Sequence, residues 1–267
     1  MSWWGKLVGG AFGFMLGGPL GAVLGAVLGH NFDKGLDSLP GADMGFDPGQ
    51  QERVQTAFFT ATFSVMGAVA KADGKVTPDE IRLAEMVMQQ MNLSADMRKT
   101  AIGLFNEGKQ ADFPLDDVLQ QFRFECHRRQ TLKQMFIEIQ LQAAYADGEM
   151  ASAERALLEK ICQSLGISSV LFRQLEQRIQ AERHFHQTGG GQQPAAMTLK
   201  DAYAILGVSE ADHDRDVKKA YRRLISQHHP DKLVSKGLPE EMMKVAADKT
   251  HEIKQAYEKI KQHRGIK

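Results

Sequence analysis

The chain has 267 residues, of which 25% are charged and 43% hydrophobic, and its 33 basic side chains balance its 33 acidic ones. This length allows one or two globular units with additional segments, and the two cysteines, 36 residues apart without a CxxC spacing, argue against a disulfide framework. They favour free thiols in a reducing compartment.

The balanced net charge hides an asymmetry along the chain. From Thr198 onward there are 15 Lys and Arg against 11 Asp and Glu, a net +4, whereas residues 31–197 carry 17 against 22, a net −5. A basic C-terminal module and an acidic middle suit different partners.

An uncharged run of 22 residues, Leu7 to Leu28, is the first predicted element. As a helix it would measure about 33 Å, which is enough to cross a bilayer, and Trp3 and Trp4 stand just outside it. We predict a transmembrane helix over residues 7–30 after a short N-terminal segment, 1–6. A cleaved signal peptide is the alternative, but the run is long for one and lacks a small-x-small cleavage site.

Glycine recurs at every fourth position from Gly5 to Gly29. Glycine destabilises helices in water, so a regular spacing calls for a reason, and in lipid it allows two helix backbones to approach closely. We expect a homodimer whose transmembrane helix is surrounded by inner-membrane lipid; ordinary glycine enrichment of a membrane helix is the alternative. The expected contact residues are Gly9, Gly13, Gly17, Gly21 and Gly25.

Residues 31–50 contain Pro40 and Pro48 and are predicted to form a juxtamembrane connector. Residues 51–183 are predicted to be a helical domain with an internal repeat at an offset of 74 residues, in which 70–75 corresponds to 144–149. Each copy has a helix, an Asp-Gly turn and a second helix. This duplicated pattern is similar to the TerB-like (tellurite-resistance) domain.

The two Asp-Gly turns raise the question of a metal site. Each copy places an aspartate seven residues before a glutamate, the pairs being Asp73 with Glu80 and Asp147 with Glu154. An EF-hand loop is excluded, because Val69 and Lys71 would occupy its first and third positions. Turn formation and helix capping explain these residues better, and only the TerB resemblance leaves room for a weak divalent-ion site. No cofactor is expected.

Four methionines form a methionine-rich run and are predicted to be adaptable core residues, although some could line a binding groove: Met86, Met88, Met91 and Met97. Around Cys126 no nucleophile stands at a useful spacing from a base, and the chain has no phosphate-binding glycine loop, HExxH or GxSxG. We therefore do not expect an enzyme.

A polar glycine-rich stretch, 184–198, separates the middle domain from the C-terminal module. As a flexible coil its fifteen residues would span roughly 20 Å. We expect the module, residues 199–267, to be tethered and free to reorient.

The stretch from Val217 to Lys232 is a predicted amphipathic helix followed by a break. Apolar residues occupy one face, namely Val217, Ala220, Tyr221, Leu224 and Ile225, and the other face carries Lys218, Lys219, Arg222 and Arg223. Pro230 ends the helix, so His229 and Asp231 should project from a loop.

A basic helix ending in His-Pro-Asp, between a Tyr203-x-x-Leu206-Gly-Val208 stretch and an Ile253-x-x-Ala-Tyr-Glu258 stretch, resembles the J domain. Thr250-His251 stands where many relatives have an aromatic residue, so the packing of the last helix should differ in detail. The resemblance implies binding to an ATP-bound DnaK-type chaperone. The residues it assigns to that contact are Lys218, Lys219, Tyr221, Arg222, Arg223, His229, Pro230, Asp231 and Lys232.

Three other interpretations of this module explain its sequence less well. A merely solvated basic face does not account for the adjoining tripeptide. A zinc pair of His228 and His229 lacks further ligands at metal spacing. Nucleic-acid binding lacks interleaved aromatic residues and a recognisable motif, so no nucleic-acid partner is expected.

The order of parts, all of them helical, resembles the membrane-anchored J-domain proteins of the DjlA type from Gram-negative bacteria. That resemblance implies an all-α co-chaperone in the bacterial inner membrane, single-pass, with the bulk of the chain cytoplasmic, acting in envelope-stress or signalling contexts. The charges flanking the apolar run weakly favour the opposite orientation, but a J domain needs the ATP-dependent chaperone of the cytosol. Two rivals remain: a stress sensor whose middle domain binds a metal or oxyanion, and a glycine-stripe oligomer that acts on the membrane itself.

Overall fold

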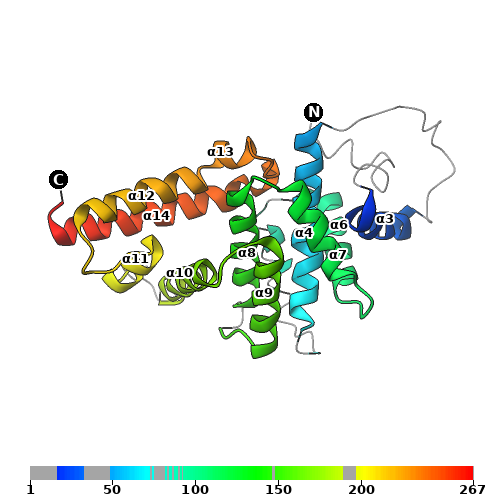
Figure 1. Ribbon diagram of the computed structural model, residues 1–267, viewed down its shortest axis with the longest axis horizontal. Helices are drawn as coiled ribbons and strands as arrows, with labels where there is room; N and C mark the ends of the chain where they lie inside the picture. Colours follow the sequence, from blue (N-terminus) through cyan, green and yellow to red (C-terminus); the bar gives the residue numbers. More distant parts are fainter. Residues whose placement is uncertain are drawn as a thin grey trace.

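The computed structural model describes residues 17–32, 49–72, 93–145, 148–188 and 197–266, with a few single positions between 74 and 91. Every regular element within these ranges is a helix, which confirms the predicted all-α class. The middle domain lies at the centre, with the N-terminal helix on one side and the C-terminal hairpin on the other (Figure 1).

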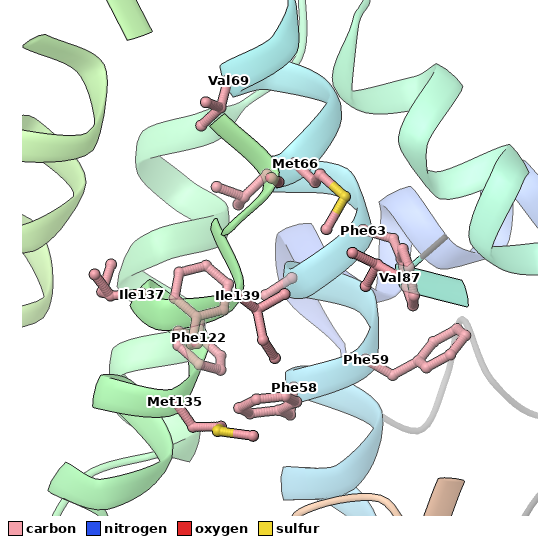
Figure 2. Packing of buried hydrophobic residues seen from close by; sticks show 14 of the residues in the cluster. Phe58, Phe59, Phe63, Met66, Val69, Val87, Phe122, Met135, Ile137 and Ile139 are labelled. Atoms are coloured by element: carbon pink, nitrogen blue, oxygen red, sulfur yellow. The ribbon is translucent and has the colours of Figure 1, made fainter. Parts of the chain in front are cut away.

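Helix α4 (Gln50–Ala70) is the central helix of the middle domain. It is buried along nearly its whole length because aromatic and small residues cover all its sides, including Phe58, Phe59 and Phe63. Around it pack α6 (Ala95–Gly108), α7 (Leu115–Glu125), α8 (Gln130–Ala144) and α9 (Ser152–Leu165). Figure 2 shows how Phe58 meets Phe122 and the residues of α8 in this core; the ring centroids of Phe58 and Phe122 are 6.1 Å apart.

Two glycines let α4 and α6 approach at backbone distance. A Cβ added at Gly67 would overlap the carbonyl oxygen of Phe105, and one added at Gly108 would overlap that of Ser64. The two helices are therefore packed as closely as their main chains allow, and neither position tolerates a side chain.

The methionine-rich stretch contributes to this core, as predicted. Met88, Met91 and Met97 are at most 1% exposed, whereas Met86 lies outside the described residues. Ser94 accepts a hydrogen bond from the backbone N–H of Met97 and so begins α6, while Gly166, at φ 72°, ends α9.

The described part of the predicted membrane run is helix α3 (Gly18–Phe32). It packs on α6, α7 and α4 and buries Leu20, Val23, Leu24 and Val27. The side chain of Gln121 accepts a hydrogen bond from the Leu20 N–H (2.7 Å) and donates one to the Gly17 carbonyl (2.8 Å). Within the described ranges no helix combines the length and apolar character needed to cross a bilayer. Residues 1–16 lie outside those ranges.

The C-terminal module consists of α11 (Leu199–Leu206), α12 (Asp214–His228), α13 (Pro230–Val234), a 3-10 turn (Glu240–Met242) and α14 (Met243–Arg264). Helices α12 and α14 lie side by side as a long hairpin (Figure 1). At the open end Arg264 donates to the Tyr203 hydroxyl (2.7 Å) and to the Glu210 carbonyl (2.7 Å). These bonds tie α14 to α11 and to the turn before α12.

The prediction that this module is free to reorient is wrong. Helix α10 (Ser169–Thr188) includes the first five residues of the expected linker; residues 189–196 lie outside the described residues. Five apolar residues of the module belong to the hydrophobic cluster of the middle domain: Leu233, Leu238, Met242, Val245 and Ala246. Since free reorientation would expose these side chains to water, the module is docked on the middle domain.

Candidate chaperone-binding site

Helix α12 presents the candidate site. Asp214 and Asp216 lie in its first turn, where the positive end of the helix dipole stabilises carboxylates. The helix ends at His228, because the next residue adopts an extended conformation (φ −61°, ψ 123°) ahead of Pro230. The break before Pro230 is where the sequence predicted it.

The His-Pro-Asp tripeptide is more ordered than an irregular loop. Pro230 occupies the first position of α13, where its missing N–H costs nothing, and Asp231 lies in the first turn of that helix. The expected loop is thus a single extended residue, His229, between two helices.

The side chains of His229 and Asp231 are 44% and 82% exposed. The His229 Nδ1 atom lies 3.9 Å from an Asp231 carboxylate oxygen, which is too far for a hydrogen bond. That nitrogen is shielded from solvent and has no hydrogen-bond partner, so the exposed part of the ring lies elsewhere. Both side chains are accessible to another protein.

Most of the predicted cations lie along the helix that leads to this tripeptide. Lys219, Arg222 and Arg223 are exposed on α12, and Lys218 is half-buried. Lys232 is exposed and its ammonium group donates to the Ser226 hydroxyl (2.7 Å). A helix with several exposed cations that ends in an accessible imidazole and carboxylate can attract and orient an acidic protein surface.

Tyr221 has a different position from the cations. Its ring stacks on Tyr257, with centroids 4.1 Å apart and an interplanar angle of 12°, and it is half-buried. Tyr221 therefore packs α12 against α14, and its contribution to binding is through the shape of the hairpin.

The weak metal candidates do not form a site in the described residues. Asp73, Glu80 and Asp147 lie outside them, and the Glu154 carboxylate accepts a hydrogen bond from the Ala151 N–H (2.8 Å), which caps α9. No group of three potential metal ligands occurs among the described residues. Capping is the role expected of Glu154, and it is confirmed.

The predicted dimerisation glycines are only partly described. Gly9 and Gly13 lie outside the described residues, and Gly17 is exposed just before α3. Gly21 is buried and Gly25 half-buried in that helix.

Cys126 and Cys162 are free thiols, as expected, and both are buried. Burial raises the pKa of each thiol to about 12, so both are neutral at physiological pH.

Sequence reasoning missed a buried group of charges where the C-terminal module meets the middle domain. It consists of Glu138 on α8, Arg178 and Glu182 on α10, His228 on α12 and Lys249 on α14, and we call it the interdomain cluster. The available signal was a lone carboxylate, Glu138, between Ile137 and Ile139 in an apolar helix. Such a residue is buried only when it is paired.

The cluster shifts the pKa values of its members. Burial would raise the pKa of Glu138, but His228, Lys249 and Arg178 outweigh it and hold that pKa below its ordinary value. Burial lowers the pKa of His228 to about 4, so its imidazole is neutral. Burial, with the neighbouring Glu252 and Glu138, raises the pKa of Glu182 to about 7 against the attraction of Lys249.

Three family descriptions match the chain in order. Residues 1–39 match "Co-chaperone DjlA transmembrane domain", residues 59–177 match "Tellurite resistance protein TerB", and residues 201–264 match "DnaJ domain". The second match runs from within α4 to within α10, and the third runs from within α11 to the end of α14.

The chain is also similar over its full length to curated proteins named "Co-chaperone protein DjlA". It is 46% identical to that of Coxiella burnetii over 270 residues, 47% identical to that of Shewanella oneidensis over 269, and 45% identical to that of Escherichia coli K12 over 276. In each case the alignment covers 100% of both chains. No solved structure gives a significant match.

Proposed function

The chain belongs to the DjlA family of co-chaperones, and we propose that it stimulates the ATPase of a DnaK-type chaperone at the cytoplasmic face of the bacterial inner membrane. The J domain, residues 199–267, binds the chaperone in its ATP state. The chain acts in envelope-stress or signalling contexts. The catalytic groups for ATP hydrolysis belong to the partner, and this chain supplies the contact that triggers them.

The accessible His229-Pro230-Asp231 tripeptide at the end of a cationic helix is the observation that carries this proposal. Arg222 and Arg223 supply attraction over a distance of about one Debye length, ~8–10 Å at ordinary ionic strength. The tripeptide supplies the specific contact, with Asp231 pairing a cation of the partner. Both sets of groups are exposed together while the module is docked on the middle domain.

The membrane location rests on the N-terminal segment. Residues 1–39 match a transmembrane domain of this family, and they contain the uncharged run from Leu7 to Leu28. We propose that the run spans the inner membrane over residues 7–30 with residues 1–6 in the periplasm, and that α3 leaves the surface of α4, α6 and α7 when it inserts. This orientation puts the J domain in the compartment that holds ATP and the chaperone.

We further propose that the chain is a homodimer through the glycine stripe, residues Gly9 to Gly25 at every fourth position. Pairing would place two J domains beside one chaperone–client complex. The second J domain then acts at a raised effective concentration, without any new contact.

Single-turnover ATP hydrolysis by the chaperone, with the full chain in liposomes, tests the proposed function. Wild type should accelerate hydrolysis and His229→Gln should not, because the variant lacks the imidazole of the proposed specific contact. The His229 side chain is 44% exposed, so its replacement should leave the fold unchanged. Equal acceleration by both proteins would refute the proposal.

A further inference from the structure

The His-Pro-Asp tripeptide is held on both sides by the middle domain. Upstream, His228 is 4% exposed, and its Nε2 atom lies 3.6 Å from a carboxylate oxygen of Glu138. Downstream, Leu233 and Leu238 are fully buried in the hydrophobic cluster of the middle domain. Between these anchors the side chains of His229 and Asp231 are accessible, as is that of Lys232.

Polar contacts reinforce the downstream anchor. The Lys236 ammonium donates to the Thr131 hydroxyl (3.1 Å), and the Gln51 side chain donates to the Val234 carbonyl (3.4 Å). Gly237, at φ 98°, lies so close to Val54 that an added Cβ would be 2.6 Å from its side chain. Residues of α4 and α8 thus fix the chain directly after the tripeptide.

The upstream anchor is the interdomain cluster, which has two cations, two carboxylates and a neutral imidazole. Arg178 lies 3.1 Å from one oxygen of Glu138, and Lys249 lies 3.8 Å from the other and 2.6 Å from Glu182. Arg178 Nη1 is also 3.4 Å from His228 Nε2. Since a guanidinium only donates, this nitrogen accepts, and the proton of the neutral ring is assigned to Nδ1.

The geometry makes Glu138 the centre of the cluster. Its carboxylate is 1% exposed and faces one residue of α10 and two of the J domain, His228 and Lys249. Buried charges are costly unless they are paired, so each member constrains where the others can lie. Through His228, the residue directly before the tripeptide, this constraint reaches the chaperone-binding end.

We infer that Glu138 of the middle domain is a positioning residue for the His-Pro-Asp tripeptide, acting through Arg178, which contacts both Glu138 and His228, and through Lys249. The middle domain then sets the direction in which the tripeptide faces the chaperone, while the exposed cations of α12 govern the encounter. This inference rests on the proposed function, in which the tripeptide triggers ATP hydrolysis.

The test compares full-length variants in liposomes by titrating each against the chaperone and measuring ATP hydrolysis. Glu138→Gln should lower the maximal stimulation at least fivefold. The concentration giving half of the maximum should stay within twofold, because Arg222 and Arg223 are untouched on the surface. A purely structural role would not separate the two quantities in this way.

Glu176→Gln is the matched control. Glu176 is a buried carboxylate on the same helix as Arg178, but it pairs with Arg155 Nη2 (2.9 Å) and accepts a hydrogen bond from Tyr145 (2.9 Å), both in the middle domain. The Glu176→Gln variant should give the wild-type titration curve of ATP hydrolysis. If Glu176→Gln and Glu138→Gln lower the maximum equally, general destabilisation is the cause and the inference is overturned.

A second variant removes the contact without leaving a lone buried charge, in case Glu138→Gln does not fold. Lys249→Met combined with Glu182→Gln deletes the pair that joins α14 to α10 and should also lower the maximum with an unchanged half-maximal concentration. Wild-type curves from the folded variants would overturn the inference. A chain in which His229→Gln has no effect would instead refute the proposed function.

Discussion

The hydroxyl hydrogen of Thr250 is shared between two backbone carbonyl oxygens, that of His228, 3.0 Å away, and that of Ala246 (2.9 Å). The carbonyl of the last residue of α12 has no partner within its own helix, so this contact satisfies a buried acceptor. It also fixes α14 against the start of the His-Pro-Asp tripeptide.

The cations of α12 should govern encounter with the chaperone. Reversing both charges, Arg222→Glu with Arg223→Glu, should raise the half-maximal concentration at least tenfold and flatten its dependence on salt, because steering depends on exposed charge. Titrations of ATPase stimulation at low and high ionic strength measure both quantities.

The control for this prediction reverses two exposed cations of the middle domain, Lys99→Glu with Arg173→Glu, which changes the net charge by the same amount. Equal effects from the two double variants would show that net charge matters and that the face of α12 does not.

The close approach of α4 and α6 should not tolerate a methyl group. Gly108→Ala should lower the free energy of unfolding by about 1–3 kcal/mol, because the new Cβ overlaps the Ser64 carbonyl and the helices must separate. Urea denaturation followed by circular dichroism measures the change. Gly49→Ala, whose new Cβ would meet no atom within 4 Å, is the control and should cost less than about 1 kcal/mol, from the weaker N-cap of α4 alone.

The interdomain cluster should give opposing pH dependences. The raised pKa of Glu182, about 7, contributes stability below pH 4.5 that is lost as pH rises towards 7. The lowered pKa of His228, about 4, contributes stability above pH 6.5 that is lost as pH falls towards 4. Between pH 4.5 and 6.5 the two slopes of stability against pH have opposite signs and largely cancel.

Glu182→Gln should therefore expose the contribution of His228. Relative to wild type, the variant should gain stability as pH rises from 4.5 to 7, with a slope of up to about 1.4 kcal/mol per pH unit. Denaturation midpoints of the two proteins across this range test it. Parallel curves would show that Glu182 has an ordinary pKa.

The glycine stripe should determine pairing in the membrane. Gly9→Leu with Gly13→Leu adds bulk without reducing hydrophobicity, so the segment should insert but cross-link as a dimer far less. Ala11→Leu adds similar bulk off the stripe and is the control. If the glycine variant pairs as well as the control, the stripe is not the interface.

Much of the module and its site could be predicted from sequence, because the signals are local. The break before Pro230 follows from the geometry of the prolyl ring, and the exposed cations follow from helical spacing. The caps at Ser94 and Gly166 lie beside the elements that they begin and end. Each of these features needs only a few neighbouring residues.

The docking could not be predicted from sequence, because it joins residues far apart in the chain. Glu138 and Lys249 belong to different domains, and neither has a neighbour in sequence that reveals the other. The glycine-rich stretch suggested a free tether, yet a linker's composition says nothing about whether Leu233 and Leu238 are buried. Tertiary packing determines that, and only the structure shows it.

The central claim is that the J domain both binds the chaperone and triggers hydrolysis, through different residues. The most direct test titrates the full chain in liposomes against ATP-loaded chaperone and records binding and hydrolysis in the same samples. His229→Gln should bind with an affinity close to wild type, because Arg222 and Arg223 remain exposed, but should not accelerate hydrolysis at any concentration. Hydrolysis accelerated equally by wild type and His229→Gln would contradict the account.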